Sequence, residues 1–184
     1  MIYEYQILVT KYSINRAVMI GVSTSDLNHA SALSDMNLSH ITETLGELNA
    51  VIAGQLDYLN WGTDLFYVSS DTTISRYGDF DKVERYEVST LGLRDFLIEL
   101  KNFKEQCHAG DYYKTIIGQA FTAIKANPLQ YKRWPTSDIY YLITLNNITF
   151  TLVLEPNDFN LTESQYVAQL KVNFSPPLAL APCH

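Results

Sequence analysis

Cysteine is scarce in this chain, and so are the features of exported and membrane proteins. The 184 residues include only two cysteines, Cys107 and Cys183, which are too few for a disulfide framework. The N-terminus begins with strand-like alternation and has no basic segment ahead of an apolar one, so we predict no signal peptide. No apolar run reaches the about 20 residues that a membrane-spanning helix needs. These absences predict a cytoplasmic protein that does not bind a membrane.

Known catalytic and cofactor-binding motifs are also missing. The chain has no Gly-x-Ser-x-Gly nucleophile elbow and no glycine-rich phosphate loop. Its two Cys-His pairs are adjacent residues, whereas zinc sites space their ligands so that the chain can wrap around the ion. Neighbouring residues on a helix point in different directions, so Cys107 and His108 do not form a nucleophile and its base. We therefore predict a protein that is not an enzyme and binds no metal or cofactor.

Basic side chains are nearly absent from residues 26–81. Arg76 is the one Lys or Arg in this span and stands against nine carboxylates, which gives the span a net charge of −8. The nine are Asp26, Asp35, Glu43, Glu47, Asp57, Asp64, Asp71, Asp79 and Asp81. A chain with this balance is not expected to bind nucleic acid, and the small basic and aromatic patch of Lys132, Arg133 and Trp134 is too small for it. The span is either a solvated surface that keeps the protein soluble or a docking face for a basic partner.

Hydrophobic residues, in contrast, are abundant. They make up 47% of the chain against 18% charged residues, which is typical of a folded globular protein. Thirteen tyrosines favour β structure and a binding surface. We predict a single α+β domain over residues 1–175, with an antiparallel sheet of about six to eight strands packed with about three helices. A proline-rich tail is expected to follow over residues 176–184.

The clearest pattern lies between residues 39 and 104. A first helix is predicted to start with Ser39 as its N-cap and to end at Gly54, with the apolar stripe Ile41, Leu45, Leu48 and Ile52. Trp61 leads into a small meander, whose strands are predicted at residues 65–68, 73–77 and 83–89. Thr90 is the predicted N-cap of a second helix, with the stripe Leu93, Phe96, Leu97, Leu100 and Phe103.

The N-terminal part is predicted to form a hairpin followed by a short helix. Its strands are expected at residues 2–10 and 14–22, joined through Lys11, Tyr12 and Ser13. Arg16 interrupts the apolar face of the second strand. Residues 27–36 allow the short helix.

The C-terminal part is predicted to contain a third helix and a second hairpin. Residues 112–124 carry the helical stripe, which Asn127 and Pro128 end. Asn146 and Asn147 suit a two-residue turn between strands at 139–145 and 148–154. Two interpretations of residues 166–174 are open: a last strand, or a helix capped by the Thr162-x-x-Gln165 pattern. The alternation of apolar and polar residues favours the strand.

The predicted elements at residues 39–52, 61–68, 73–77, 83–88 and 89–103 follow one another as helix, Trp-led strand, return strand, acidic and aromatic strand, and helix. This order resembles small bacterial immunity proteins, which neutralise toxins of contact-dependent growth inhibition and related polymorphic toxin systems. The resemblance implies an acidic, non-enzymatic protein that binds a cognate toxin domain, commonly a basic nuclease. It transfers no functional residue, because the group shares no motif.

The acidic span and its aromatic residues supply the predicted site. Interfaces combine aromatic anchors with surrounding charge. The predicted partner-binding residues are Asp57, Tyr58, Trp61, Asp64, Tyr67, Asp71, Tyr77, Asp79 and Asp81. The protein itself is expected to be a monomer or a weak dimer. Two alternatives stay open, namely a small-molecule-binding module or enzyme with a Tyr-lined pocket, and an assembly protein joined through the hairpin of residues 139–154.

Overall fold

The chain divides into two compact units, each formed by two separate segments. The computed structural model describes residues 1–27, 30–63, 66–79, 85–133 and 139–172. Unit 1 consists of Met1–Tyr5 and Ile20–Ala109, and unit 2 consists of Gln6–Met19 and Gly110–His184. The described residues form nine strands in two sheets together with helices, so the predicted α+β class is confirmed. The single domain predicted over residues 1–175 stays a prediction.

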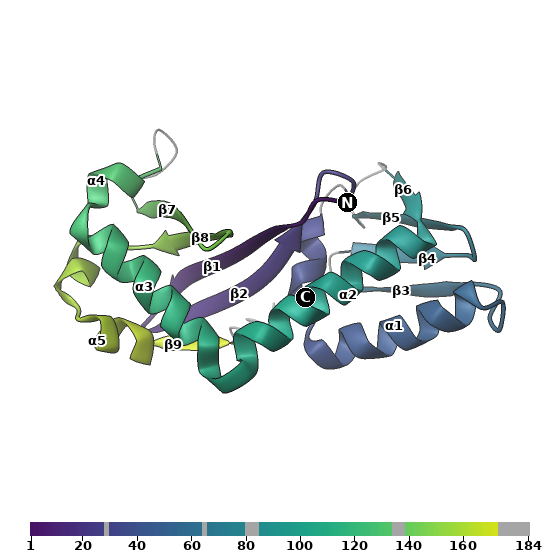
Figure 1. The fold of residues 1–184 in the computed structure, drawn as a ribbon, viewed down its shortest axis with the longest axis horizontal. Coiled ribbons are helices and arrows are strands. Elements are labelled where there is room, and N and C mark those ends of the chain that lie inside the picture. The colour runs from purple at the N-terminus through teal and green to yellow at the C-terminus, as the bar shows by residue number, and fades with distance from the viewer. Residues whose placement is uncertain (28–29, 64–65, 80–84, 134–138, 173–184) are drawn as a thin grey trace, which may run out of the picture. The chain divides into compact units, whose positions relative to one another are not determined.

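Unit 1 contains two long helices, side by side, and a four-stranded antiparallel sheet in the order β3-β4-β5-β6 (Figure 1). Its elements are the 3-10 helix η1 (Ala30–Asp35), α1 (Leu38–Ile52), β3 (Leu59–Thr63), β4 (Phe66–Ser70), β5 (Ile74–Asp79), β6 (Arg85–Ser89) and α2 (Thr90–His108). The predicted meander and short helix are confirmed. Trp61, expected to lead straight into the next strand, lies in a strand of its own, β3, which pairs with β4.

Both long helices of unit 1 begin earlier than predicted. Asn37, not Ser39, caps α1, and its side chain accepts the backbone N–H three residues later at 2.8 Å. Ser89, not Thr90, caps α2 in the same way at 3.0 Å. A cap needs an extended backbone together with a side-chain acceptor, and both residues have these features. Gly54 ends α1 as predicted, with φ at +71°, a conformation that glycine adopts without strain.

Buried hydroxyl groups attach the start of α2 to the turn between β4 and β5. Ser75 Oγ lies 2.7 Å from Ser70 Oγ and 3.1 Å from Thr90 Oγ1, and all three residues have no exposed surface. Thr90 in turn donates to the carbonyl oxygen of Asp71 at 2.7 Å. Because each buried hydroxyl has a partner, the chain of contacts avoids the cost of unsatisfied polar groups.

Unit 2 is organised around a sheet in the order β7-β8-β1-β2-β9, with α3 packed against β7 and β8 (Figure 1). Two strands, β1 (Glu4–Tyr12) and β2 (Asn15–Ser23), contribute residues to both units. The other elements are η2 (Ala109–Asp111), α3 (Tyr112–Ala126), α4 (Pro128–Tyr131), β7 (Tyr140–Leu145), β8 (Ile148–Val153), η3 (Pro156–Asn160), α5 (Glu163–Ala168) and β9 (Leu170–Val172). The strand β9 pairs parallel to β2, so the sheet is not wholly antiparallel.

The two hairpin turns have the backbone that their residues favour. Asn146 and Asn147 have φ of 50° and 62°, which confirms the predicted two-residue turn between β7 and β8. The turn between β1 and β2 was predicted to start two positions and to end one position too early. It consists of Ser13, with φ of 54°, and Ile14, whereas Lys11 and Tyr12 still belong to β1.

The strand predicted over residues 166–174 is wrong for its first part, which forms α5. Thr162 and Gln165 make a reciprocal capping box at its start, the alternative that the sequence had left open. Tyr166 is fully buried and stacks on Phe121 of α3, with ring centroids 4.0 Å apart. Among the described residues of this stretch, Leu170–Val172 form a strand, and residues 173–174 and the predicted tail lie outside the described residues.

A buried ion pair lies at the centre of unit 2. Arg16 is 1% exposed, on the same face of β2 as Val18, and its Nη2 lies 2.6 Å from Oδ1 of Asp158. Its remaining groups donate to the Gln169 side chain at 2.9 Å and to the Val153 carbonyl at 3.3 Å. The guanidinium also lies 4.5 Å from the centre of the Tyr166 ring. The residue that interrupts the apolar pattern is therefore part of the core, with its charge compensated.

Candidate functional site

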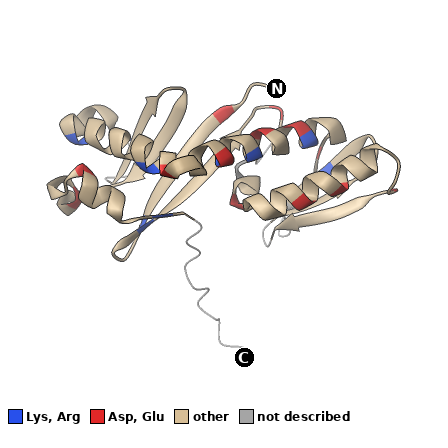
Figure 2. Ribbon diagram, turned by 60° about the horizontal axis from the view of Figure 1, so that its bottom comes forward, with Lys and Arg blue, Asp and Glu red and all other residues tan. Residues whose placement is uncertain are grey.

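Charge is divided unequally between the two units. Unit 1 has fifteen Asp and Glu against six Lys and Arg, a net charge of −9, and unit 2 has five against seven, a net charge of +2. Helix α1 carries acidic side chains and no basic one, whereas α2 carries both kinds (Figure 2). The acidic character predicted for residues 26–81 is thus a property of one compact unit.

Among the described residues, several exposed carboxylates without an ion-pair partner lie on α1 and just after it. Glu43 and Glu47, one helical turn apart, and Asp57 are exposed, and none of them forms an ion pair with a described residue. Two large side chains adjoin Asp57 in the chain, namely Leu56, which is 43% exposed, and Tyr58, which is 66% exposed. We call these five residues the acidic α1 surface.

Asp71, also predicted to bind a partner, has a structural role. Its Oδ1 accepts hydrogen bonds from the backbone N–H of Thr73 and of Ile74, both at 2.8 Å, and from the Thr73 hydroxyl at 2.9 Å. Its other oxygen lies 3.4 Å from Arg76, which also pairs with Glu87 at 2.9 Å. These bonds favour the charged carboxylate and lower the pKa of Asp71 to about 2. The residue holds the β4–β5 turn.

The predicted aromatic residues of the sheet do not form one exposed group. Tyr77 is only 2% exposed and packs in the core, with ring centroids 5.4 Å from Phe66, so its assignment to a surface is wrong. Trp61 pairs in register with the buried Val68 and is half-buried on that same face of the sheet. Tyr67 is half-buried on the opposite face, because alternate residues of a strand point to opposite sides.

The remaining predicted residues are Asp64, Asp81 and the side chain of Asp79, which lie outside the described part of the structure. Their role stays a prediction. Of the nine predicted residues, Asp57 and Tyr58 are therefore the ones that the structure places on an exposed surface without an ion-pair partner among the described residues.

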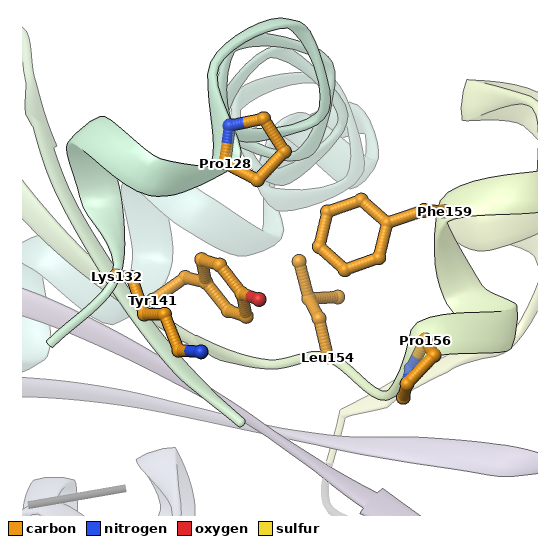
Figure 3. Close-up of a pocket in the computed structure, with 6 residues that line it drawn as sticks. All are labelled: Pro128, Lys132, Tyr141, Leu154, Pro156 and Phe159. Atoms are coloured by element: carbon orange, nitrogen blue, oxygen red, sulfur yellow. The ribbon is translucent and has the colours of Figure 1, made fainter. Parts of the chain in front are cut away.

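A pocket of about 410 Å³ lies in unit 2 (Figure 3). Its lining residues come from α4 and the residue after it, from β7, from the end of β8 and from η3, and they are Pro128, Lys132, Tyr141, Leu154, Pro156 and Phe159. The Tyr141 and Phe159 rings meet edge to face, with centroids 5.5 Å apart. One of the thirteen tyrosines thus lines this pocket, where the sequence alternative expected several.

The pocket residues were missed by the sequence reasoning, because they lie in separate elements between residues 128 and 159. The sequence offered one indication of this site, namely the segment from Pro128 to Pro135 after α3, which contains basic and aromatic residues. The proline rings at positions 128 and 156 open α4 and η3, where a missing N–H costs no helical hydrogen bond.

Two side chains of unit 1 that can act as nucleophiles, Cys107 and Lys104, are buried. Cys107 has no exposed surface, and burial raises the pKa of its thiol to about 12, which disfavours the reactive thiolate. Burial likewise lowers the pKa of Lys104 to about 8, and its Nζ donates to the Ser34 carbonyl at 2.6 Å.

In the described ranges, no group of three or more His, Cys, Asp and Glu side chains is placed to bind a metal ion. No helix in the same ranges has the length and apolarity to cross a membrane.

No protein-family model, curated protein or solved structure gives a significant match to this chain.

Proposed function

We propose that this protein is a non-enzymatic immunity protein, which binds a basic toxin domain through the acidic α1 surface and neutralises it. The observation that supports this proposal is the net charge of −9 in unit 1, together with three exposed carboxylates that lack an ion-pair partner among the described residues. Glu43 and Glu47 repel each other across one turn of α1, and a basic partner would relieve this repulsion.

The surface has the composition of a protein interface. Leu56 and Tyr58, on either side of Asp57 in the chain, provide exposed apolar area, which a partner can bury. In this mechanism the negative field accelerates the encounter with a positively charged toxin, and burial of the tyrosine slows dissociation. The bound protein then prevents the toxin from reaching its substrate.

The test uses the C-terminal domain of any large secreted protein encoded beside this chain. Wild-type protein should rescue the growth of cells that express this domain and should bind it with an association rate that falls as salt is raised. The double variant Glu43→Lys with Glu47→Lys should associate at least about tenfold more slowly, because charges at an interface act mainly on the association rate.

A matched control changes the same amount of charge on the other helix. Asp95 and Glu105 lie on α2, and each already has a basic partner, at 2.6 Å. Asp95→Lys with Glu105→Lys should leave binding and protection close to wild type, and thermal melting should show both double variants folded. Absence of a complex, or equal slowing by the two double variants, would contradict the proposal.

A further inference from the structure

The pocket of unit 2 has a lining that the acidic α1 surface does not share. Five of its six lining residues are proline, leucine, phenylalanine or tyrosine. We propose that it binds a small, uncharged aromatic compound that carries one hydrogen-bonding group, such as a phenol. This site does not depend on toxin binding, because it consists of different residues in a different unit. Its volume of about 410 Å³ lies within the range of roughly 300 to 1,000 Å³ that is usual for small-molecule sites.

The walls of the pocket favour a flat apolar ligand. Two proline rings, the Leu154 side chain and the Phe159 ring present carbon atoms, and Tyr141 adds the side of its own ring (Figure 3). Leu154 is 1% exposed and Tyr141 is 7% exposed, so these walls are held by the core behind them. The Tyr141 and Phe159 rings meet at 69°, and a third ring can add to such a pair edge to face or offset.

One hydroxyl group favours a polar substituent on the ligand ring. The Tyr141 hydroxyl is directed into the cavity in Figure 3 and makes no hydrogen bond to a described residue. Because a hydroxyl both donates and accepts, it can pair with a hydroxyl or a carbonyl group of the ligand. Lys132, the remaining lining residue, is engaged in an interaction of its own, and we assign it no contact with the ligand.

A charged ligand would fit this arrangement less well than an uncharged one. Burial of an ionised group is costly unless an opposite charge or several hydrogen bonds compensate it. The Tyr141 hydroxyl offers one hydrogen bond and no charge, and the proline, leucine and phenylalanine side chains offer neither. An uncharged ring with one polar group should therefore bind better than an acid or an amine of the same shape.

The elements around the pocket are fixed before any ligand binds. The backbone N–H of Arg133 donates to the Tyr140 carbonyl at 2.9 Å, which attaches the residues after α4 to β7. On the other side, Asp158 accepts the Glu155 N–H at 2.8 Å and closes the capping box that holds η3 and Phe159. A preformed site loses less conformational entropy on binding.

The probe that tests the proposal is 4-methylphenol, followed by chemical shifts in a ¹H–¹⁵N NMR titration of the full chain near neutral pH, where a phenol is uncharged. Shifts should concentrate on residues 128–132, 141 and 154–159. Four further probes separate the ring, the hydroxyl and the charge. Toluene lacks the hydroxyl, 4-methylcyclohexanol lacks the aromatic ring, 4-methylbenzoate is an anion and 4-methylbenzylamine is a cation.

The order of affinities follows from the contacts that each probe loses. 4-Methylphenol should bind roughly fivefold more tightly than toluene, which makes no hydrogen bond to the Tyr141 hydroxyl. It should bind roughly fivefold more tightly than 4-methylcyclohexanol, which makes no ring-to-ring contact. It should exceed both ions at least about tenfold, because their charge loses its hydration in the pocket.

Variants assign the interaction to individual side chains. Tyr141→Phe should reduce the affinity for 4-methylphenol roughly fivefold and leave that for toluene unchanged. Phe159→Leu should weaken both probes, because it removes a ring that both contact. Tyr140→Phe is the matched control and should bind like wild type, since Tyr140 is the preceding residue of β7, lies outside the pocket and points to the other face of the sheet.

Four outcomes would overturn the proposal. They are the absence of shifts at millimolar 4-methylphenol, shifts located away from the pocket, binding of either ion as tight as that of the phenol, and equal affinity for the phenol and toluene. The comparison of probes uses the wild-type protein, so it remains decisive if a variant fails to fold.

Discussion

The buried ion pair between Arg16 and Asp158 allows a quantitative test of the core of unit 2. The perturbation is a double-mutant cycle with Arg16→Met and Asp158→Asn. Both substitutions keep the approximate size of the side chain, and the second also keeps an oxygen that can accept the N–H of Glu155. The side chains are 1% and 5% exposed, so either single change leaves the other charge away from water.

The expected magnitude follows from this burial. Removal of one partner of a buried ion pair costs about 3 to 5 kcal/mol of the free energy of unfolding. For Arg16→Met we expect the lower end, about 3 kcal/mol, because Lys11 Nζ remains 3.5 Å from the Asp158 carboxylate. The double variant has no uncompensated charge, so its cost should be less than the sum of the two single costs by about 2 kcal/mol.

Urea unfolding followed by circular dichroism measures these costs, and an unchanged slope with urea shows that the variants unfold in the same manner. The control cycle is Lys114→Met with Asp111→Asn, an exposed pair of the same unit at 3.0 Å, which should show no measurable coupling. If the costs of Arg16→Met and Asp158→Asn simply add, the reasoning about a desolvated, mutually dependent pair is wrong.

Two further predictions concern unit 1. Phe96 has no exposed surface, so Phe96→Ala should lower the free energy of unfolding by about 3 to 5 kcal/mol in urea titrations, whereas Leu91→Ala, at a side chain 50% exposed, should change it by less than about 1 kcal/mol. Asp71 has its pKa lowered to about 2 from 3.8, so its contribution to stability is present above pH 3.8 and is lost as the pH falls towards 2. Melting temperatures of wild type and Asp71→Ala should therefore differ at pH 7 and converge near pH 2, and a constant difference across this range would contradict the turn assignment.

Sequence patterns correctly predicted the helices and turns that depend on residues close together in the chain. The apolar stripes of α1, α2 and α3 follow the period of a helix, and the structure buries them except at Ile52, which is half-buried, and Tyr112, which is exposed. Gly54 and the Asn146-Asn147 turn have positive φ, which their residue types tolerate in any fold. The caps were misplaced by one or two residues, because several neighbouring side chains are of types that can cap a helix and only the backbone path selects one.

The region after Thr162 shows why a period can mislead. Tyr166 and Leu170 are both buried, and a separation of four residues fits one face of a helix as well as one face of a strand. The capping box and the stacking on Phe121 decide for the helix, and the second of these is a contact with a residue 45 positions earlier in the chain.

In the candidate site, too, some features follow from the sequence and others depend on contacts between distant residues. The strongly acidic character of residues 26–81 can be read from the sequence, because charge is a sum over residues and does not depend on the fold. Which of these carboxylates are exposed without an ion-pair partner depends on the tertiary structure, which places Asp71 in a turn and leaves Glu43, Glu47 and Asp57 exposed. It also buries Arg16 beside Asp158 and assembles the pocket from α4, β7 and η3. Burial, pairing and cavities depend on contacts between residues that are far apart in the chain, and no local pattern contains these contacts.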